Sequence, residues 1–325
     1  MAAGDRSTIL TLHTHSVVQA SMGAGPTLTN FLGVEDVSVD PQVAEILNYA
    51  AGDYRPSFTA TKEIAPMFEF SCLDIANALT LIDHQDGFGV TGATAGDEFR
   101  VYFAKKALAG TRATGSNHIR FGSKLCFVWL EEITANDNED AIARFRVATA
   151  YDTTNECLII STGVALPSSI NPLTQKFKLG KVLLNAANLA GVTGITYRTG
   201  CEVGVVHGGG DHRPTFLSVT QVAPEIEIRV KELPAYSTFY GTGSYTVAGA
   251  SACTFYLYKR LKNAVVATDI TAEHIKMSTT AAFSRISMSR LSATNNQDAT
   301  GAIMVRPVFD GSAKPVVFDL VSAVT

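Results

Sequence analysis

The sequence predicts a mainly β protein made of two tandem, duplicated β-sandwich or barrel modules, each with a short flanking helix. Three observations support this class: several short segments alternate apolar and polar residues, one segment has helical spacing, and a motif recurs after a whole domain's length. The chain has 325 residues, 46% of them hydrophobic and 17% charged, which is enough for a substantial core.

The internal repeat defines the predicted modules. GDYRPSF at residues 52–58 returns as GDHRPTF at residues 210–216, a shift of 158 positions. Without gaps, residues 31–72 align with 189–230, and ten of these 42 pairs are identical, where chance would give roughly three. The same shift relates residues 133–152 to 291–310. We therefore expect a first module over residues 1–167 and a second over 168–325, with a linker at 168–180.

Strands are expected where polar and apolar residues alternate or where β-branched and aromatic residues cluster. In the first module these segments are residues 34–40, 65–72, 99–105, 123–130, 143–151 and 156–164. In the second they are residues 223–233, 253–259, 283–289, 301–309 and 314–321. The Asn-rich segments 133–141 and 291–299 are typical of turns between strands.

One helix is expected in the first module. SCLDIANALTLIDH, residues 71–84, places apolar residues near helical spacing after Ser71, a residue type that favours the N-cap. The matching part of the second module contains Pro234, which restricts any helix to a short one that begins at or after it.

The repeated motif predicts a turn that leads into a strand. Glycine allows a positive φ, Asp bonds its own backbone two residues on, and Pro fixes φ where a strand begins. We expect Phe58 and Phe216 to anchor these strands in the core. Each Asp and Arg of the motif pairs either locally or with a neighbouring subunit. The candidate contact residues are Gly52, Asp53, Arg55 and Pro56 in the first copy and Gly210, Asp211, Arg213 and Pro214 in the second.

The stretch HGGG at residues 207–210 resembles the oxyanion loop of lipases and esterases, which would make the chain a hydrolase. That function also requires a nucleophile in a G-x-S-x-G sequence, and the chain contains none. In the repeat, residues 207–209 align with Tyr49, Ala50 and Ala51, so only the final glycine is shared. The repeat therefore favours a structural turn, and no catalytic residue is expected.

Other chemical signals are weak. The net charge of −4 argues against a surface that grips nucleic acid. The five cysteines form no CxxC pair, so we expect reduced, mostly buried thiols. His13 and His15 form an H-x-H sequence without a third metal ligand nearby. No metal site or cofactor is expected, and neither a membrane span nor a secretory signal is visible.

Two longer segments carry a family likeness. They are GDYRPSFTATKEIAPMFEFSCLDIANAL at residues 52–79 and NEDAIARFRVATAYD at residues 138–152. In their order of turn, alternating strand, helix and later strand, they resemble the tail-tube (major tail) proteins of long-tailed bacteriophages, especially subunits with two tandem tube domains. The second copy departs from this pattern where Pro234 and its neighbours replace the helix-forming residues.

The resemblance implies a virion structural protein. Tube domains of this family are β-sandwiches with a flanking helix, and six close into a ring, so a duplicated subunit would form trimers with pseudo-sixfold symmetry. The rings would stack head to tail into a hollow tail tube through which DNA passes, with tape-measure, baseplate and terminator proteins as further partners. Such a protein is assembled in the host cytoplasm. A lumen that releases DNA is expected to carry more Asp and Glu than Lys and Arg.

Three alternatives remain open at this point. A capsid protein with two tandem jelly rolls would also trimerise into a pseudohexamer. A tail-terminator or baseplate ring would share the fold without polymerising. A carbohydrate-binding or esterase module would be distinguished by an ester-hydrolysis assay with a His207→Ala control.

Overall fold

Strands form almost all of the regular structure. A computed structural model describes residues 13–21, 28–49, 51, 54–82, 90–92, 97–107, 111–167, 173, 175–231, 246–247, 253–261, 265–279, 284–293, 299–309, 311 and 314–324. Within these residues it contains twenty-four strands and one helix, and the strands pair antiparallel. The predicted mainly β class is therefore confirmed.

The elements follow in chain order. The N-terminal half contains β1 (His13–Ser21), β2 (Thr29–Phe31), β3 (Val34–Asp40), β4 (Val43–Tyr49), β5 (Pro56–Ile64), β6 (Met67–Cys72), α1 (Ile75–Leu81), β7 (Val90–Gly92), β8 (Glu98–Lys105), β9 (His118–Ser123), β10 (Leu125–Asn136), β11 (Ile142–Ala150) and β12 (Ile159–Val164). The C-terminal half contains β13 (Gln175–Leu184), β14 (Ala187–Asn188), β15 (Val192–Arg198), β16 (Glu202–His207), β17 (Pro214–Gln221), β18 (Glu225–Val230), β19 (Thr246–Val247), β20 (Cys253–Leu261), β21 (His274–Thr279), β22 (Arg285–Ser292), β23 (Thr300–Arg306) and β24 (Val316–Ser322).

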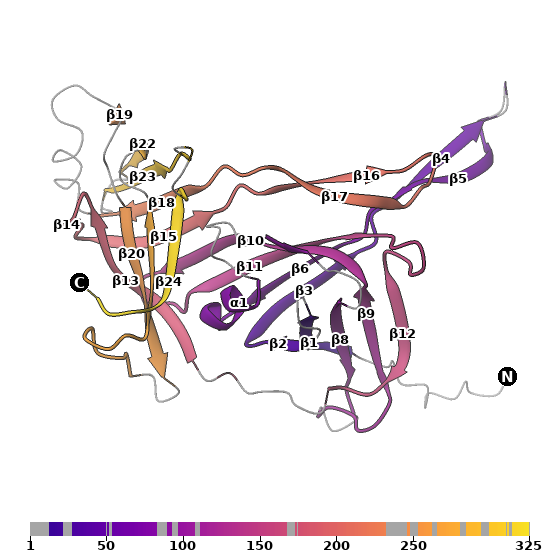
Figure 1. The fold of residues 1–325 in the computed structure, drawn as a ribbon, viewed down its shortest axis with the longest axis horizontal. Helices are drawn as coiled ribbons and strands as arrows, with labels where there is room; N and C mark the ends of the chain where they lie inside the picture. Colours follow the sequence, from indigo (N-terminus) through magenta and orange to yellow (C-terminus); the bar gives the residue numbers. More distant parts are fainter. Residues whose placement is uncertain are drawn as a thin grey trace.

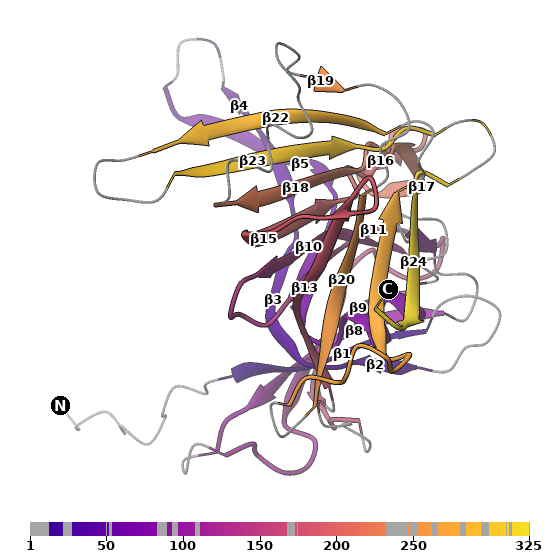
Figure 2. The same ribbon diagram turned by 90° about the vertical axis from the view of Figure 1, so that its left-hand side faces the viewer.

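A ten-stranded sheet, here called the large sheet, runs through both halves. Its strand order is β19-β22-β23-β18-β15-β10-β11-β6-β3, with β7 paired to β10 off this path. Figure 2 shows β22, β23, β18, β15 and β10 in succession, with strands of the C-terminal half crossing beside them. The alternation of β18 explains its place, because Ile226, Ile228 and Val230 are buried in the core while the intervening charged residues are not.

Two five-stranded small sheets pack with the large sheet around a common core. Their orders are β12-β9-β8-β1-β2 in the N-terminal half and β14-β13-β20-β21-β24 in the C-terminal half. Figure 1 places them on either side of α1. One continuous cluster of buried side chains, from Phe68 and Phe145 to Ile228 and Ile303, spans both halves. The hydrophobic effect therefore stabilises the two halves as one body.

Two hairpins extend away from this body. We call β4–β5 the first arm and β16–β17 the second arm, and each is a separate two-stranded sheet. Figure 1 shows the second arm crossing the N-terminal half and ending near the first arm. The backbone N–H of Ile64 at the end of β5 donates to the carbonyl oxygen of His212 at the tip of the second arm, at 2.9 Å.

Several expected boundaries differ from the structure. The helix begins after Asp74, not Ser71, because the Asp74 carboxylate accepts the backbone N–H of Asn77 at 3.2 Å while Ser71 belongs to β6. Residues 175–180, expected in the linker, form the first part of β13, which pairs with β20. Strand β10 continues to Asn136, into the segment expected as a turn. The segment after Pro234 lies outside the described residues.

The cysteines are free thiols, as expected. Cys72, Cys126, Cys157 and Cys253 are buried, and Cys201 is partly exposed. Among the described residues, no helix is both long and apolar enough to cross a bilayer.

Candidate assembly surfaces

The second arm is docked on the outer face of the large sheet. Leu217 of β17 packs with Trp129 of β10 and with Ala148 and Ala150 of β11, and all four side chains are buried. Partly buried apolar residues of β16, including Val203 and Val205, border this cluster. The arm of the C-terminal half is thus held by apolar burial against the N-terminal half.

The repeated arginine of the second arm makes the contact at its tip. The Nε and Nη2 atoms of Arg213 lie 2.8 and 2.9 Å from the two carboxylate oxygens of Glu156. The guanidinium carbon lies 4.9 Å from the centre of the Tyr151 ring, within range of a cation–π interaction. The Tyr151 backbone N–H also donates to the Pro214 carbonyl at 2.7 Å. Arg213 therefore binds the other half of the chain rather than only its own turn.

The turn that presents Arg213 has the expected geometry. Gly210 has a φ of 91°, a region that disfavours other residues. The Asp211 carboxylate accepts the backbone N–H of Arg213 at 3.0 Å, as in an Asx turn, and lies 4.0 Å from its guanidinium. Pro214 is the first residue of β17, where its fixed φ suits the start of a strand.

The HGGG stretch belongs to the same turn. His207 ends β16, and its Nε2 atom lies 3.6 Å from Glu63 at the end of the first arm. Gly209 also has a positive φ, at 46°, and an added Cβ there would meet no atom within 4 Å. The glycines therefore serve the reversal of an exposed hairpin tip.

The first arm has the same register but rests on no other element of the described structure apart from its base. Pro56 begins β5, as Pro214 begins β17. The Arg55 guanidinium donates to the hydroxyl of its neighbour Tyr54 at 2.8 Å and lies over that ring. Gly52 and Asp53, the other two candidate residues, lie outside the described residues. The contact of Arg55 with Tyr54 is local, whereas the contact of Arg213 with Glu156 is long-range.

The expectation that Phe58 and Phe216 anchor their strands in the core is wrong. Their side chains are 61% and 60% exposed. A two-stranded arm that leaves the body has only one sheet layer, so it cannot bury both of its faces. The first arm exposes further large apolar side chains, namely Val43, Ile46, Leu47, Tyr49 and Tyr54. Such a patch marks an interaction surface more often than an ordinary solvent-exposed face.

The large sheet ends in two open edges. Within the described residues, the outer edge of β3 pairs with no strand, and β22 pairs with β19 only at residues 286 and 287. The remainder of that edge of β22 includes Leu291, whose side chain is 56% exposed. Open edges carry unpaired backbone donors and acceptors, which can template pairing with another chain.

Ion pairs cover the outer face of the large sheet near the middle. Glu132 contacts both Arg144 and Arg198, at 3.2 and 3.5 Å, and Arg146 bridges Glu69 and Glu131 at 2.9 and 3.0 Å. Arg198 also approaches Glu227 at 3.6 Å. These contacts join four glutamates to three arginines, and the expected acidic excess in a lumen stays a prediction.

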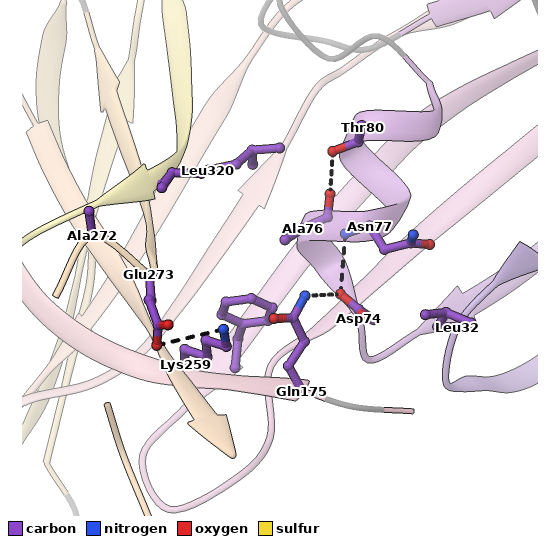
Figure 3. A pocket seen from close by; sticks show the side chains of 12 residues that line it. Leu32, Asp74, Ala76, Asn77, Thr80, Gln175, Lys259, Ala272, Glu273 and Leu320 are labelled. Atoms are coloured by element: carbon purple, nitrogen blue, oxygen red, sulfur yellow. Dashed lines mark hydrogen bonds and ion pairs between the residues drawn. The ribbon is translucent and has the colours of Figure 1, made fainter. Parts of the chain in front are cut away.

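A cavity of about 440 Å³ lies between α1 and the C-terminal half. Figure 3 shows Asp74, Gln175 and Lys259 pointing toward it. Burial raises the pKa of the Asp74 carboxyl, and hydrogen bonds from the Gln175 side chain and the Asn77 backbone act in the opposite direction. The Gln175 amide donates to Asp74 at 2.8 Å, which joins the start of α1 to β13. Lys259 lies 3.6 Å from Glu273, which joins β20 to the turn before β21.

Among the described residues, no group of three or more His, Cys, Asp or Glu side chains could hold a metal ion. His13 lies in β1, opposite Lys105 of β8.

No protein-family model and no curated protein matches this sequence. Sequence reasoning found the repeated turn but missed the two arms and the partner Glu156, although the largely apolar composition of residues 43–49 was a usable signal for a strand.

Proposed function

We propose that the chain is a duplicated structural subunit, three copies of which close into a pseudo-hexameric ring that stacks into a hollow tube for DNA, as in a bacteriophage tail. The duplication is supported by the order of pairing. Reading β13–β24 for β1–β12 turns the order β12-β9-β8-β1-β2 into β24-β21-β20-β13-β14, which is that of the C-terminal small sheet. The segment β7-β10-β11-β6-β3 becomes β19-β22-β23-β18-β15 in the same way.

Residue registers support the duplication independently. Leu47 pairs with Thr59 in the first arm, and Val205 pairs with Leu217 in the second arm, so the two pairs are related by a shift of 158.

Unusual backbone conformations recur at the same shift. Residues with positive φ include the pairs Gly33 and Gly191, Gln42 and Gly200, and Thr153 and Gly311.

One observation carries the proposed assembly. The two strands that are equivalent to the strands at the junction between the halves have open edges, toward the two ends of the large sheet. Strand β15 joins the N-terminal half by pairing with β10. The equivalent of β15 is β3, and the equivalent of β10 is β22, and these are the strands with open edges. Repeating the same contact between chains is a head-to-tail association, which gives a ring when the rotation closes. A closed ring removes both edges.

The number of copies and the role of the tube come from the family resemblance. Six equivalent modules per ring require three chains of two modules each. The ion pairs on the outer face of the large sheet would suit a lumen wall, because paired charges offer few free cations to phosphate. Exposed arms on the rings are suited to contacts between or within rings.

The capsid alternative fits this geometry less well. Two tandem jelly rolls would be two separate sandwiches, whereas here one sheet and one core run through both halves. Electron microscopy of the purified protein tests the proposal. Stacked rings or tubes support it, single rings that never stack favour a terminator or baseplate role, and shells or flat lattices overturn it in favour of a capsid protein.

A further inference from the structure

We infer that β3 of one copy pairs antiparallel with β22 of a second copy, with Val39 opposite Leu291 and Asp40 opposite Arg290, and that the polarity of this charge pair keeps the two kinds of junction distinct. The inference rests on the proposed function, since it names the surface through which the subunits would associate. It is specific to this chain because it depends on a register that the chain itself displays between its halves.

The internal junction supplies the template. In it, Ile133 of β10 lies opposite Tyr197 of β15, and both side chains are buried in the core. Glu132 lies opposite Arg198, with 3.5 Å between their charged atoms. The remaining described pairs are Thr134 with Thr196, Ala135 with Ile195 and Asn136 with Gly194.

The shift of 158 transfers this register without adjustment. Strands β10 and β22 pair with β11 and β23 in the same register, including a bulge before Glu132 and before Arg290. Strands β3 and β15 pair with β6 and β18 in the same register as well. The sheets around the open edges are therefore set as they are around the closed junction.

The transferred pairs are compatible in chemistry. Leu291 meets Val39, two apolar residues where the template has Ile133 and Tyr197. The other pairs are Ser292 with Ser38, two hydroxyl residues like Thr134 and Thr196, and Ala293 with Val37, a small and a branched residue like Ala135 and Ile195. Matched cross-strand pairs of these types stabilise a sheet.

Side chains at the open edges are more exposed than their equivalents at the closed junction. Ile133 is 1% exposed in the closed junction, whereas its equivalent Leu291 is 56% exposed. Tyr197 is completely buried, whereas its equivalent Val39 is only partly buried against the core. An added strand in the proposed register would cover both residues and extend the core across the new junction.

The charge pair is inverted between the two junctions. The closed junction has Glu132 on the β10 side and Arg198 on the β15 side. The open edges have Arg290 on the β22 side and Asp40 on the β3 side. If β10 took β3 of another copy, Glu132 would face Asp40, and if β22 took β15, Arg290 would face Arg198. Like charges opposite each other destabilise a strand pair, so the inversion favours alternation of N-terminal and C-terminal halves.

One feature of the template is not reproduced. Thr199 closes the internal junction, since its backbone N–H donates to the Glu131 carbonyl at 3.0 Å and its hydroxyl to the Leu130 carbonyl at 2.6 Å. The equivalent residue is Pro41, which has neither donor. The junction between copies is therefore held by fewer hydrogen bonds than the one within the chain.

Disulfide trapping tests the register. The full chain carrying Val39→Cys and Leu291→Cys is oxidised mildly and compared with Ser38→Cys and Leu291→Cys, in which the first cysteine lies on the other face of β3. Each single variant controls for the native thiols. Strands β3 and β22 lie toward opposite ends of the large sheet (Figure 2), so a bond between positions 39 and 291 joins two copies.

The expected result is a covalent trimer on a non-reducing gel for the 39/291 pair and little cross-linking for the 38/291 pair. A native trimer that cross-links neither pair, or both equally, overturns the register but leaves the proposed function standing. A chain that stays monomeric at all concentrations overturns both.

Charge reversal tests, without new covalent bonds, whether the Asp40–Arg290 pair keeps the two kinds of junction distinct. Asp40→Arg and Arg290→Glu alone should each raise the concentration needed for trimer formation about tenfold or more, because two like charges then face each other. The double variant should assemble again at the concentration of the natural chain, but into a mixture of trimers and other assemblies, because like halves can then also join. Single variants that assemble like the natural chain, or a double variant that assembles as poorly as the singles, contradict the inference.

Discussion

The first and second arms share one register but have different surroundings. The second arm lies on the N-terminal half, where Leu217 is buried against Trp129 and Arg213 binds Glu156 and Tyr151. The first arm leaves Leu47, Tyr49 and Phe58 exposed, and Arg55 contacts Tyr54 beside it. The contacts of the repeated motif therefore depend on whether the surface that receives its arm lies in the same chain.

The receiving surface for the first arm would be the C-terminal half of a second copy. Phe309 is the equivalent of Tyr151 and is 60% exposed. An exposed aromatic ring therefore occupies the position from which Tyr151 contacts Arg213 in the other half. Lys314 stands where Glu156 stands, so the ion pair of Arg213 is not reproduced. The docking of the first arm would therefore depend on apolar and ring contacts more than on charge.

The largest expected effect concerns the tryptophan under the docked arm. Trp129→Ala should lower the free energy of unfolding by about 3–5 kcal/mol, since it removes a buried aromatic side chain. The matched control is Ser287→Ala at the equivalent position, where a change within about 0.5 kcal/mol is expected. Denaturant unfolding at one protein concentration measures both, and equal losses would show that Trp129 has no special role.

A second comparison uses two equivalent turns with positive φ. Gly200→Ala should destabilise the chain by more than about 1 kcal/mol, because the new Cβ would clash with the Ala223 carbonyl oxygen and because φ is positive there. Gln42→Gly, at a φ of 44°, should stabilise it by up to about 1 kcal/mol, by relieving a conformation that side chains disfavour. Thermal unfolding of the two variants checks this, and shifts of the same sign would refute the equivalence of the turns.

The arginines provide a subtler test. Arg213→Ala should lower stability slightly, through loss of the Glu156 and Tyr151 contacts on an exposed surface. Arg55→Ala should weaken assembly more than it lowers the stability of the isolated chain. Unfolding curves at a concentration below assembly, together with sedimentation at a higher one, separate these effects. Equal loss of stability in both variants would contradict the difference between the arms.

The smallest effect is the labelling of Cys201 at the base of the second arm. Burial, with a smaller effect from Glu202, raises the pKa of this thiol to about 11 from its ordinary 9.0. The thiolate is the reactive form, so labelling by a thiol reagent should keep accelerating up to about pH 11. Trp129→Ala should speed labelling at pH 8 by loosening the arm, and Cys201→Ser should remove the fastest phase. A rate that levels off near pH 9 would indicate an open site.

The sequence could predict the features that depend on local pattern. Alternation located β3, β6 and β18, and the Asp-x-Arg-Pro motif located the start of β5 and β17. It could not show that Phe58 and Phe216 lie on arms outside the core, because exposure depends on which layers surround a strand. Nor could it show Glu156 as the partner of Arg213, since they are 57 residues apart and meet only through the path of the second arm.

The mass of the native assembly shows whether three chains close into a ring. The chain has a mass of 34.6 kDa, and three copies closed through β3 and β22 should give a particle of three times that mass, or whole multiples of it when rings stack. Native mass spectrometry of the full chain across a dilution series measures this. We expect trimers that dissociate to monomers without stable dimers, because only a closed ring satisfies every edge. Stable dimers, or monomers at every concentration, would contradict it.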